Sequence, residues 1–425
     1  MLLVLLFFLQ TAGVSHAGAS HSSVAAFART RDLGDARMKA GDYPGAVAAY
    51  QDALEMAPAN EAAELGLAEG YRRVFNYDKS EKLLERAARQ HPTSAAPQVA
   101  LGRLEIELQR YDKAIAALLR AVARAPKDAT ARDDLAAAYQ AKGDAAAALR
   151  QTDAALALNP RDALAHFLRA EIFADQNRND AALKDVRAVL ADQPTNARAR
   201  KLAGKILVRI PQCKEAVAML EPLAQGTGAQ TPDSETLFML QRAYECAGDK
   251  QKAGEGAAKF EESSKTDRTT KENSTEALHL VRQANDLAMK NQFPGAIDLL
   301  QQALQKDAAN GDAYAQLAKI YFSEGKISEA DEAVQKALEQ SPYKPDYLYV
   351  QGKIQEKQKQ PDMALATFQK IIEINPEETD AYYEIAAIEQ ARGDTKAAIG
   401  ALRRCLVASP EDQDCRNALA AAREN

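Results

Sequence analysis

The sequence predicts an all-α protein made of tandem helical hairpins, and three observations lead to this prediction. Prolines recur at a fixed interval of about 34 residues, and two columns of very small residues recur at the same interval. The chain is also rich in alanine, the residue with the highest helix propensity, and it contains no tryptophan. A fixed interval of this length indicates a repeat architecture in which each unit covers the apolar side of its neighbour.

The prolines mark where each unit ends. The same interval separates Pro58, Pro92, Pro126, Pro160 and Pro194, and it returns with Pro342, Pro376 and Pro410. Proline cannot continue an α-helix, and it disfavours helical backbone in the residue before it. Each of these prolines is therefore expected to follow the second helix of a hairpin.

The small residues mark where two helices approach each other closely. Twelve residues before the prolines stand Ala46, Ser80, Ala114, Ala148, Ala182, Ala330, Ala364 and Ala398. Twenty-four residues before them stand Gly34, Ala68, Gly102, Ala136, Ala170, Ala318, Gly352 and Ala386. Two such columns in each unit predict two helices packed at short range.

Short turns separate the two helices of a unit. Gly-Asp pairs occupy several of them: Gly41-Asp42, Gly143-Asp144, Gly248-Asp249 and Gly393-Asp394. Glycine readily takes the left-handed conformation that ends a helix, and aspartate caps the first turn of the next one.

These features resemble the tetratricopeptide repeat family, whose unit is a helix–turn–helix of the same length with small residues in these columns and a closing proline. The leading tryptophan of the family is absent, and Tyr314 and Tyr382 hold its place in two units. The resemblance implies a right-handed α-solenoid of about eleven repeats with a concave groove lined by the first helices. The units start near Phe27, Glu61, Ala95, Ala129, Ala163, Ala197, Ser234, Ala277, Gly311, Pro345 and Thr379.

Two irregular segments divide the array. The register gains about three residues between Gln225 and Asp233, and residues 263–276 are polar without apolar periodicity, as expected for a frayed helix end and a linker. The predicted organisation is a signal peptide over 1–17, about seven repeats over 18–267, a polar linker over 268–276, four repeats over 277–412 and a capping helix over 413–425.

The first residues predict export. An apolar run over Leu2–Leu9 precedes small residues, and a signal peptidase could cleave after Ala17 or Ala19. The run is much shorter than the roughly 20 residues that a membrane-spanning helix needs, although an uncleaved anchor is the alternative. No cysteine stands directly after the run, so a lipoprotein is not expected. No later stretch predicts a transmembrane segment, and the protein is expected to be periplasmic or secreted.

Four cysteines in an exported chain suggest two disulfides. The repeat register places Cys213 and Cys246 near corresponding turns of neighbouring units. It places Cys405 near the end of the second helix of the last repeat and Cys415 at the start of the capping helix. We therefore predict the pairs Cys213–Cys246 and Cys405–Cys415. Four small buried thiols are the alternative.

Composition and motifs argue against several classes of function. The formal net charge of −6 gives no general reason to expect nucleic acid as a partner. His91, His166 and His279 are scattered over three units without partners at metal-binding spacing, so no metal, cofactor or catalytic residue is predicted. The repeats also leave too few residues for a typical catalytic domain, and the protein is not expected to be an enzyme.

The best candidate binding residues lie on first helices. Arg198, Lys201, Lys205 and Arg209 share one helical stripe, with Arg242 expected on the equivalent face of the next unit. Such cations can attract acidic side chains or a terminal carboxylate; a solvated face with ion pairs to Glu171 or Glu235 is the alternative. Lys319, Lys353 and Lys357 form a weaker basic set. Expected aromatic anchors are Phe167, Phe238, Phe322, Tyr349 and Tyr383.

The resulting hypothesis is a non-catalytic scaffold of the cell envelope or secretory compartment that binds extended protein segments or assembly subunits. Two alternatives stay open. One is an accessory subunit of a polysaccharide-export, pilus or secretion assembly. The other is the non-catalytic arm of an enzyme such as a glycosyltransferase. The oligomeric state and the identity of the partner do not follow from the sequence.

Overall fold

The computed structural model describes residues 15–225 and 232–424, and every regular element in those ranges is an α-helix. The all-α prediction is thereby confirmed. The predicted signal peptide lies almost wholly outside the described residues, and the predicted insertion near Gln225 lies partly outside them. The helices belong to two compact units, one made mainly of residues 1–91 and 281–425, the other of residues 92–280.

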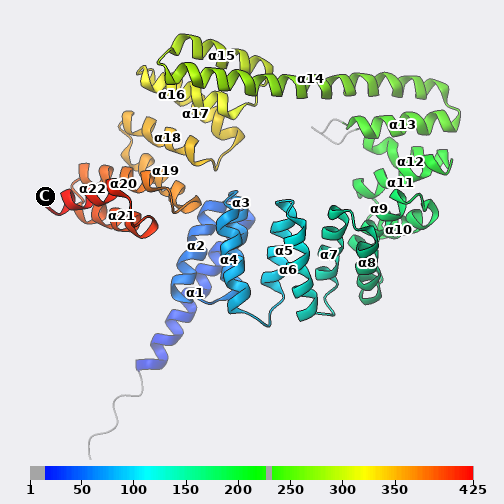
Figure 1. The fold of residues 1–425 in the computed structure, drawn as a ribbon, viewed down its shortest axis with the longest axis horizontal. Helices are drawn as coiled ribbons and strands as arrows, with labels where there is room; N and C mark the ends of the chain where they lie inside the picture. The colour runs from blue at the N-terminus through cyan, green and yellow to red at the C-terminus, as the bar shows by residue number, and fades with distance from the viewer. Residues whose placement is uncertain (1–14, 226–231, 425) are drawn as a thin grey trace, which may run out of the picture. The chain divides into compact units, whose positions relative to one another are not determined.

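The first compact unit contains the beginning and the end of the chain (Figure 1). Its helices are α1 (Ser15–Ala40), α2 (Tyr43–Met56), α3 (Glu61–Arg73), α4 (Tyr77–Gln90), α15 (Phe293–Lys306), α16 (Gly311–Ser323), α17 (Ile327–Gln340), α18 (Pro345–Lys357), α19 (Pro361–Ile374), α20 (Thr379–Ala391), α21 (Thr395–Ala408) and α22 (Gln413–Glu424). They pack as consecutive hairpins, with α22 against α20 and α21.

The second compact unit contains the middle of the chain. Its helices are α5 (Ala96–Glu107), α6 (Tyr111–Arg124), α7 (Ala129–Lys142), α8 (Ala145–Leu158), α9 (Ala163–Asp175), α10 (Asn179–Asp192), α11 (Ala197–Arg209), α12 (Cys213–Ala224) and α13 (Ser234–Ala247). The long helix α14 (Lys250–Met289) starts in this unit and ends in the other, with the boundary after Leu280.

The repeat ends lie where the prolines predict them. Helix α2 ends at Met56, two residues before Pro58, and α19 ends at Ile374, two residues before Pro376. The other six closing prolines have the same relation to the helices before them. The interval between the prolines is therefore the length of one helical hairpin with its connecting turns.

Both columns of small residues are buried between the two helices of a hairpin. Ala136 and Ala148 have no exposed surface, and Gly102 and Gly352 are buried as well. In the second repeat a serine stands in the column, and its buried Oγ donates a hydrogen bond to the carbonyl oxygen of Ala68 at 2.8 Å. That hydrogen bond satisfies the hydroxyl of Ser80, which can thus replace alanine at this close approach.

The turns between the helices have the conformation that the Gly-Asp pairs predict. Gly143 has a φ of +89°, and the side chain of Asp144 accepts a hydrogen bond from the backbone N–H of Ala147 at 2.9 Å. The same turn position is left-handed in other units even where glycine is absent, as at Phe75, Gln109 and Lys359. The left-handed turn is thus required by the hairpin itself, because it recurs with unfavourable residues.

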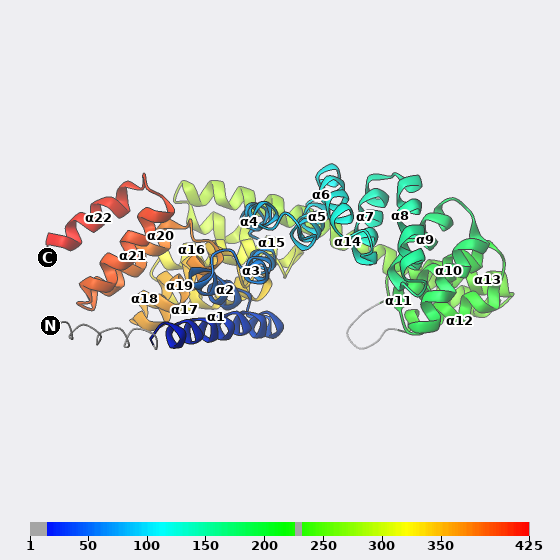
Figure 2. The ribbon, with the colours of Figure 1, turned by 90° about the horizontal axis from the view of Figure 1, so that it is seen from below.

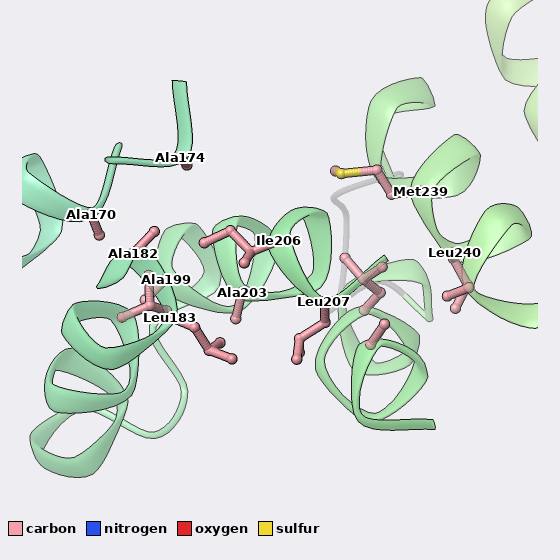
Figure 3. Packing of buried hydrophobic residues seen from close by; sticks show 14 of the residues in the cluster. Ala170, Ala174, Ala182, Leu183, Ala199, Ala203, Ile206, Leu207, Met239 and Leu240 are labelled. Atoms are coloured by element: carbon pink, nitrogen blue, oxygen red, sulfur yellow. The ribbon is translucent and has the colours of Figure 1, made fainter. Parts of the chain in front are cut away.

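Neighbouring hairpins share one continuous apolar layer. In the second compact unit it runs from Phe167 of α9 to Ala253 of α14. Figure 3 shows Ala170, Ala203 and Leu207 meeting side chains from adjacent helices. Each hairpin therefore depends on its neighbour to remove its apolar side from water.

Helix α14 differs from the sequence-based expectation. Residues 263–276, predicted as a frayed end and a linker, lie inside one unbroken helix (Figure 1). The polar composition reflects exposure of this stretch, not loss of helix: between Ala257 and Gln292 no glycine or proline interrupts the chain. One helix thus serves as the second helix of the seventh repeat and the first helix of the eighth. The division into two arrays stays a prediction.

None of the helices within residues 15–225 and 232–424 combines the length and the apolar character that are needed to cross a bilayer.

Candidate binding face

Three consecutive first helices in the second compact unit form the candidate binding face. Helix α11 contacts α9 on one side and α13 on the other. Together these helices carry the predicted cations and two of the predicted aromatic residues. We define the α9–α11–α13 face by Phe167, Glu171, Arg198, Lys201, Lys205, Phe238 and Arg242.

Arg198 is an exposed cation of this face. Its side chain is 75% exposed, and its guanidinium lies 4.6 Å from the centre of the Phe167 ring. Its ion pair to Glu171 is long, at 3.8 Å. Burial raises the pKa of Glu171, so this ion pair does not compensate for the desolvation of the carboxyl group. Arg198 therefore has donors available for another acceptor.

Lys201 is already engaged by the next repeat. Its Nζ lies 2.8 Å from Asp233 Oδ1 and 2.7 Å from Glu235 Oε2. Partial burial favours the neutral amine, but the hydrogen bonds to these carboxylates outweigh it and raise the pKa of Lys201. This lysine links α11 to the start of α13.

The other two predicted cations of α11 differ in their surroundings. Arg209 Nη1 donates a hydrogen bond to the carbonyl oxygen of Ala174 at 2.7 Å, and so satisfies an acceptor in the last turn of α9. The positive charge of Lys205 favours the ionised form of the Glu171 carboxyl group. Lys205 and Arg198 thus act on the same carboxylate.

Helix α13 adds an exposed aromatic group to the face. Phe238 is 40% exposed, and its ring centre lies 5.2 Å from that of Phe260 on α14. The guanidinium of Arg242 lies 5.9 Å from the centre of the Phe238 ring. An aromatic ring beside a guanidinium offers both apolar area and directed donors to a partner.

The remaining predicted residues lie in the other compact unit. Tyr349 Oη donates a hydrogen bond to Glu384 Oε1 at 2.6 Å, and Lys353 Nζ lies 2.8 Å from Glu384 Oε2. Burial, followed by the hydrogen bond to Glu384, raises the pKa of Tyr349. Tyr383 is exposed. Tyr349 and Lys353 therefore pair with a carboxylate of the next repeat.

A buried charged network on α9 and α10 escaped sequence reasoning. Asp185 is buried, where it accepts a hydrogen bond from Arg169 Nε at 2.7 Å and lies 2.8 Å from His166 Nδ1. The second ring nitrogen of His166 lies 3.1 Å from the carbonyl oxygen of Pro160. His166 thus has a structural position between a helix and the proline turn. Arg169 and Asp185 are 16 residues apart, a spacing that recurs between facing residues of a hairpin, and this spacing could have predicted their contact.

The structure contains both predicted disulfides. Cys213 pairs with Cys246 and joins α12 to α13, whereas Cys405 pairs with Cys415 and joins α21 to α22. Asp412 lies beside the second pair and caps α22 by accepting a hydrogen bond from the N–H of Cys415 at 2.8 Å. The two disulfides hold the irregular sixth–seventh junction and the final helix.

Consecutive helical hairpins that pack along the chain define a helical repeat protein. The sequence models of the tetratricopeptide repeat match residues 31–197 and 287–378 in overlapping segments. The chain belongs to the tetratricopeptide repeat family. Proteins of this family bind protein or peptide partners and are generally non-catalytic scaffolds.

Several solved structures are similar to this chain at low sequence identity. The structure of pilF from Pseudomonas aeruginosa is 17% identical, with a TM-score of 0.45, and the match covers 52% of this chain and 97% of that one. YrrB, described as a tetratricopeptide repeat protein with an unusual peptide-binding site, is 21% identical, with a TM-score of 0.34 and coverages of 44% and 95%. The Cut9–Hcn1 structure is 14% identical, with a TM-score of 0.34 and coverages of 96% and 99%. A comparison with curated protein sequences gave no match.

Proposed function

We propose that this protein is an exported, non-catalytic scaffold that binds an extended acidic protein segment on the α9–α11–α13 face. The observation that carries the proposal is the exposed guanidinium of Arg198, stacked on Phe167 and only weakly paired with Glu171. It stands in a family whose members bind peptides and proteins on their repeats.

The chemistry of the face favours an acidic partner with apolar side chains. Arg198, Lys205 and Arg242 supply positive charge, and Phe238 supplies exposed aromatic area. A carboxylate that approaches Arg198 can replace its long ion pair with a shorter, bidentate one. Arginine and aromatic residues are also the groups that most often dominate interface energy.

Export is supported by the two disulfides together with the predicted signal peptide. Disulfides persist in oxidising compartments and are rare in reducing ones. The proposed location is the periplasm or the extracellular space.

Site-specific photocrosslinking tests the binding face. A benzoylphenylalanine at position 205 is expected to capture a protein partner in the native envelope fraction, whereas the same group at position 187 on α10 is not. Mass spectrometry of the captured product identifies the partner, which is then purified for affinity measurements.

Charge reversal tests whether the cations make the contact. The triple variant Arg198→Glu, Lys205→Glu, Arg242→Glu is expected to weaken binding at least about tenfold and to flatten its salt dependence. The matched control Lys184→Glu, Arg187→Glu, Lys214→Glu makes the same change in net charge on the exposed sides of α10 and α12. Equal affinity of the two triple variants for the purified partner would contradict the proposed face.

A further inference from the structure

The first two repeats of the chain meet the ninth and tenth repeats inside one compact unit. Residues 1–91 and most of residues 281–425 belong to this unit, and α2 packs against α19. Figures 1 and 2 both show these two helices side by side. The contact joins segments about 300 residues apart in the chain, and it is not part of the hairpin-to-hairpin packing that the repeats predict.

One half of this contact centres on Tyr343, which follows α17. Its Oη donates a hydrogen bond to the carbonyl oxygen of Gly41 at 2.8 Å, in the turn between α1 and α2. Its ring meets the ring of Tyr43 edge-on, with the centres 5.8 Å apart. The Nζ of Lys370 lies 5.2 Å from the centre of the Tyr343 ring.

The other half centres on Asn76, at the start of α4. Its Oδ1 caps α4 by accepting a hydrogen bond from the N–H of Lys79 at 3.3 Å. Its Nδ2 donates to the carbonyl oxygen of Ile374, the last residue of α19, at 3.1 Å. Lys79 Nζ lies 3.3 Å from Glu377 Oε1, which places an ion pair beside this hydrogen bond.

The character of the contact differs from that of the neighbouring repeats. Packing inside the repeats buries apolar residues completely, as with Ala364 and Phe368 of α19. The contact between the first two repeats and the ninth and tenth instead includes side-chain hydrogen bonds, an aromatic pair and an ion pair whose Glu377 side chain is 60% exposed. The two hydrogen bonds are part-buried, whereas the ion pair has an exposed carboxylate, and such an ion pair is weak and screened by salt.

We propose that Tyr43, Asn76 and Lys79 on one side and Tyr343, Ile374 and Glu377 on the other form a reversible intramolecular clasp between the first two repeats and the ninth and tenth repeats. The covalent chain holds both sides at high effective concentration, so contacts that are weak individually suffice to close it. Any partner that prefers the open or the closed form shifts this equilibrium. The proposal does not depend on the α9–α11–α13 face.

Two conservative substitutions separate the clasp from folding. Asn76→Asp keeps an acceptor that caps α4 but removes the donor to Ile374, and aspartate already caps α2 and α8 at the equivalent position. Tyr343→Phe keeps the aromatic pair but removes the hydroxyl that contacts Gly41. Neither change removes apolar packing between hairpins.

A carbodiimide provides the measurement, because it joins an amine and a carboxylate in direct contact as an amide. The wild-type chain is expected to give a Lys79–Glu377 crosslink within one molecule, as read by mass spectrometry on a mixture of ¹⁴N- and ¹⁵N-labelled protein. The yield is expected to fall at least fivefold in the double variant Asn76→Asp, Tyr343→Phe. The Lys201–Glu235 crosslink, from a pair 2.7 Å apart, is the reference in the same sample.

Two further readings test specificity and reversibility. The exchange of charges in Lys79→Glu, Glu377→Lys is expected to restore a crosslink between the same two positions. High salt during the reaction is expected to lower the yield of the wild-type crosslink. Protein that is dialysed back to low salt before the reaction is expected to give the original yield. The proposal is overturned if the Lys79–Glu377 crosslink is absent while the reference crosslink forms, or if it joins light and heavy copies. It is also overturned if the double variant Asn76→Asp, Tyr343→Phe leaves the yield unchanged. The same holds if the charge exchange gives no crosslink, or if salt has no reversible effect on the yield.

Discussion

The ring of Phe368 fills the space that a side chain on Gly352 would occupy. A Cβ placed on Gly352 of α18 would lie 2.5 Å from Cζ of Phe368 on α19, well inside van der Waals contact. Phe368 is fully buried and also meets the ring of Tyr349, so it has little freedom to move. The same spacing along the chain pairs Gly102 with Leu118 and Gly204 with Leu220.

This relationship predicts whether two substitutions of glycine by alanine lower or raise the free energy of unfolding. Gly352→Ala gains about 1 kcal/mol of helix propensity but forces Phe368 out of place, a change that costs about 1–3 kcal/mol. We expect a net loss of free energy of unfolding, measured by urea denaturation. Gly400→Ala lies in α21, where an added Cβ would meet nothing, and it is expected to stabilise by up to about 1 kcal/mol.

A double-mutant cycle tests the cause. In the background Phe368→Val, the change Gly352→Ala is expected to become neutral or stabilising, because the chain already pairs Ala170 with Val186 at this spacing. If Gly352→Ala were equally harmful in both backgrounds, the ring of Phe368 would not be the reason for the glycine.

The left-handed turns predict that substitutions at two equivalent positions change the free energy of unfolding in opposite directions. Gln109 has a φ of +58°, and Gly143 occupies the same turn one repeat later with a φ of +89°. Gln109→Gly is expected to raise the free energy of unfolding by about 0.5–1 kcal/mol, and Gly143→Ala to lower it by a similar amount. Nothing approaches an added Cβ at Gly143, so only the backbone conformation contributes. Thermal unfolding of both variants checks the two signs together.

Sequence reasoning succeeded where the repeat imposes the structure. Pro58 and its equivalents predict helix ends, and Ala46 and its equivalents predict close helix contacts, because a hairpin cannot pack otherwise. The left-handed conformation of Phe75 was missed, since the turn overrides the preference of the residue that occupies it. The continuity of α14 was missed because a polar stretch without glycine or proline can be either a linker or an exposed helix.

The candidate site was only partly predictable, for a different reason. Periodicity places Arg198 and Arg209 on one stripe of α11, but it does not show which acceptors face them. The structure shows Arg209 bonded to the carbonyl oxygen of Ala174 and Arg198 stacked on Phe167. These contacts cross between repeats, and a helical periodicity contains no information about them. The contact of Asn76 with Ile374 follows no repeat interval, and no pattern in the sequence indicates it.

The buried carboxyl group of Asp133 predicts a dependence of stability on pH. Its side chain is buried, and Oδ1 has no hydrogen-bond partner among the described residues. Burial, followed by the negative charges of Asp162 and Asp134, raises the pKa of Asp133 from 3.8 to about 7. The folded protein therefore binds this proton more tightly than the unfolded chain does.

The sign of the effect follows from linkage. Between about pH 4 and pH 7 the folded state holds more protons at this site, so the contribution of Asp133 to stability falls as the pH rises through that window. An asparagine stays neutral, so Asp133→Asn is expected to stabilise by on the order of 2 kcal/mol above pH 7 and to have little effect near pH 4. Urea denaturation of both proteins across this range is the measurement, and a constant difference between them would contradict the prediction.

The disulfide between Cys405 and Cys415 is expected to hold the final helix on the array. Helix α22 packs against α20 and α21, and the disulfide closes a short loop between the last hairpin and α22. Such a crosslink contributes about 2–4 kcal/mol by restricting the unfolded chain. Replacement of both cysteines by alanine is therefore expected to free α22 while the hairpins before it stay folded. Hydrogen exchange is the measurement, with loss of protection confined to residues 413–424 and the end of α21.

The choice of substitute and control decides what this experiment can show. Alanine is appropriate because Cys405 and Cys415 are both buried, and serine would bury an additional hydroxyl at each position. The matched control replaces Cys213 and Cys246 in the same way. There the loss of protection should appear at α12 and α13 with α22 unchanged, because each disulfide acts on the two helices that it joins. Loss of protection at α22 in both variants would instead mean that the array unfolds as a whole and that neither disulfide acts locally.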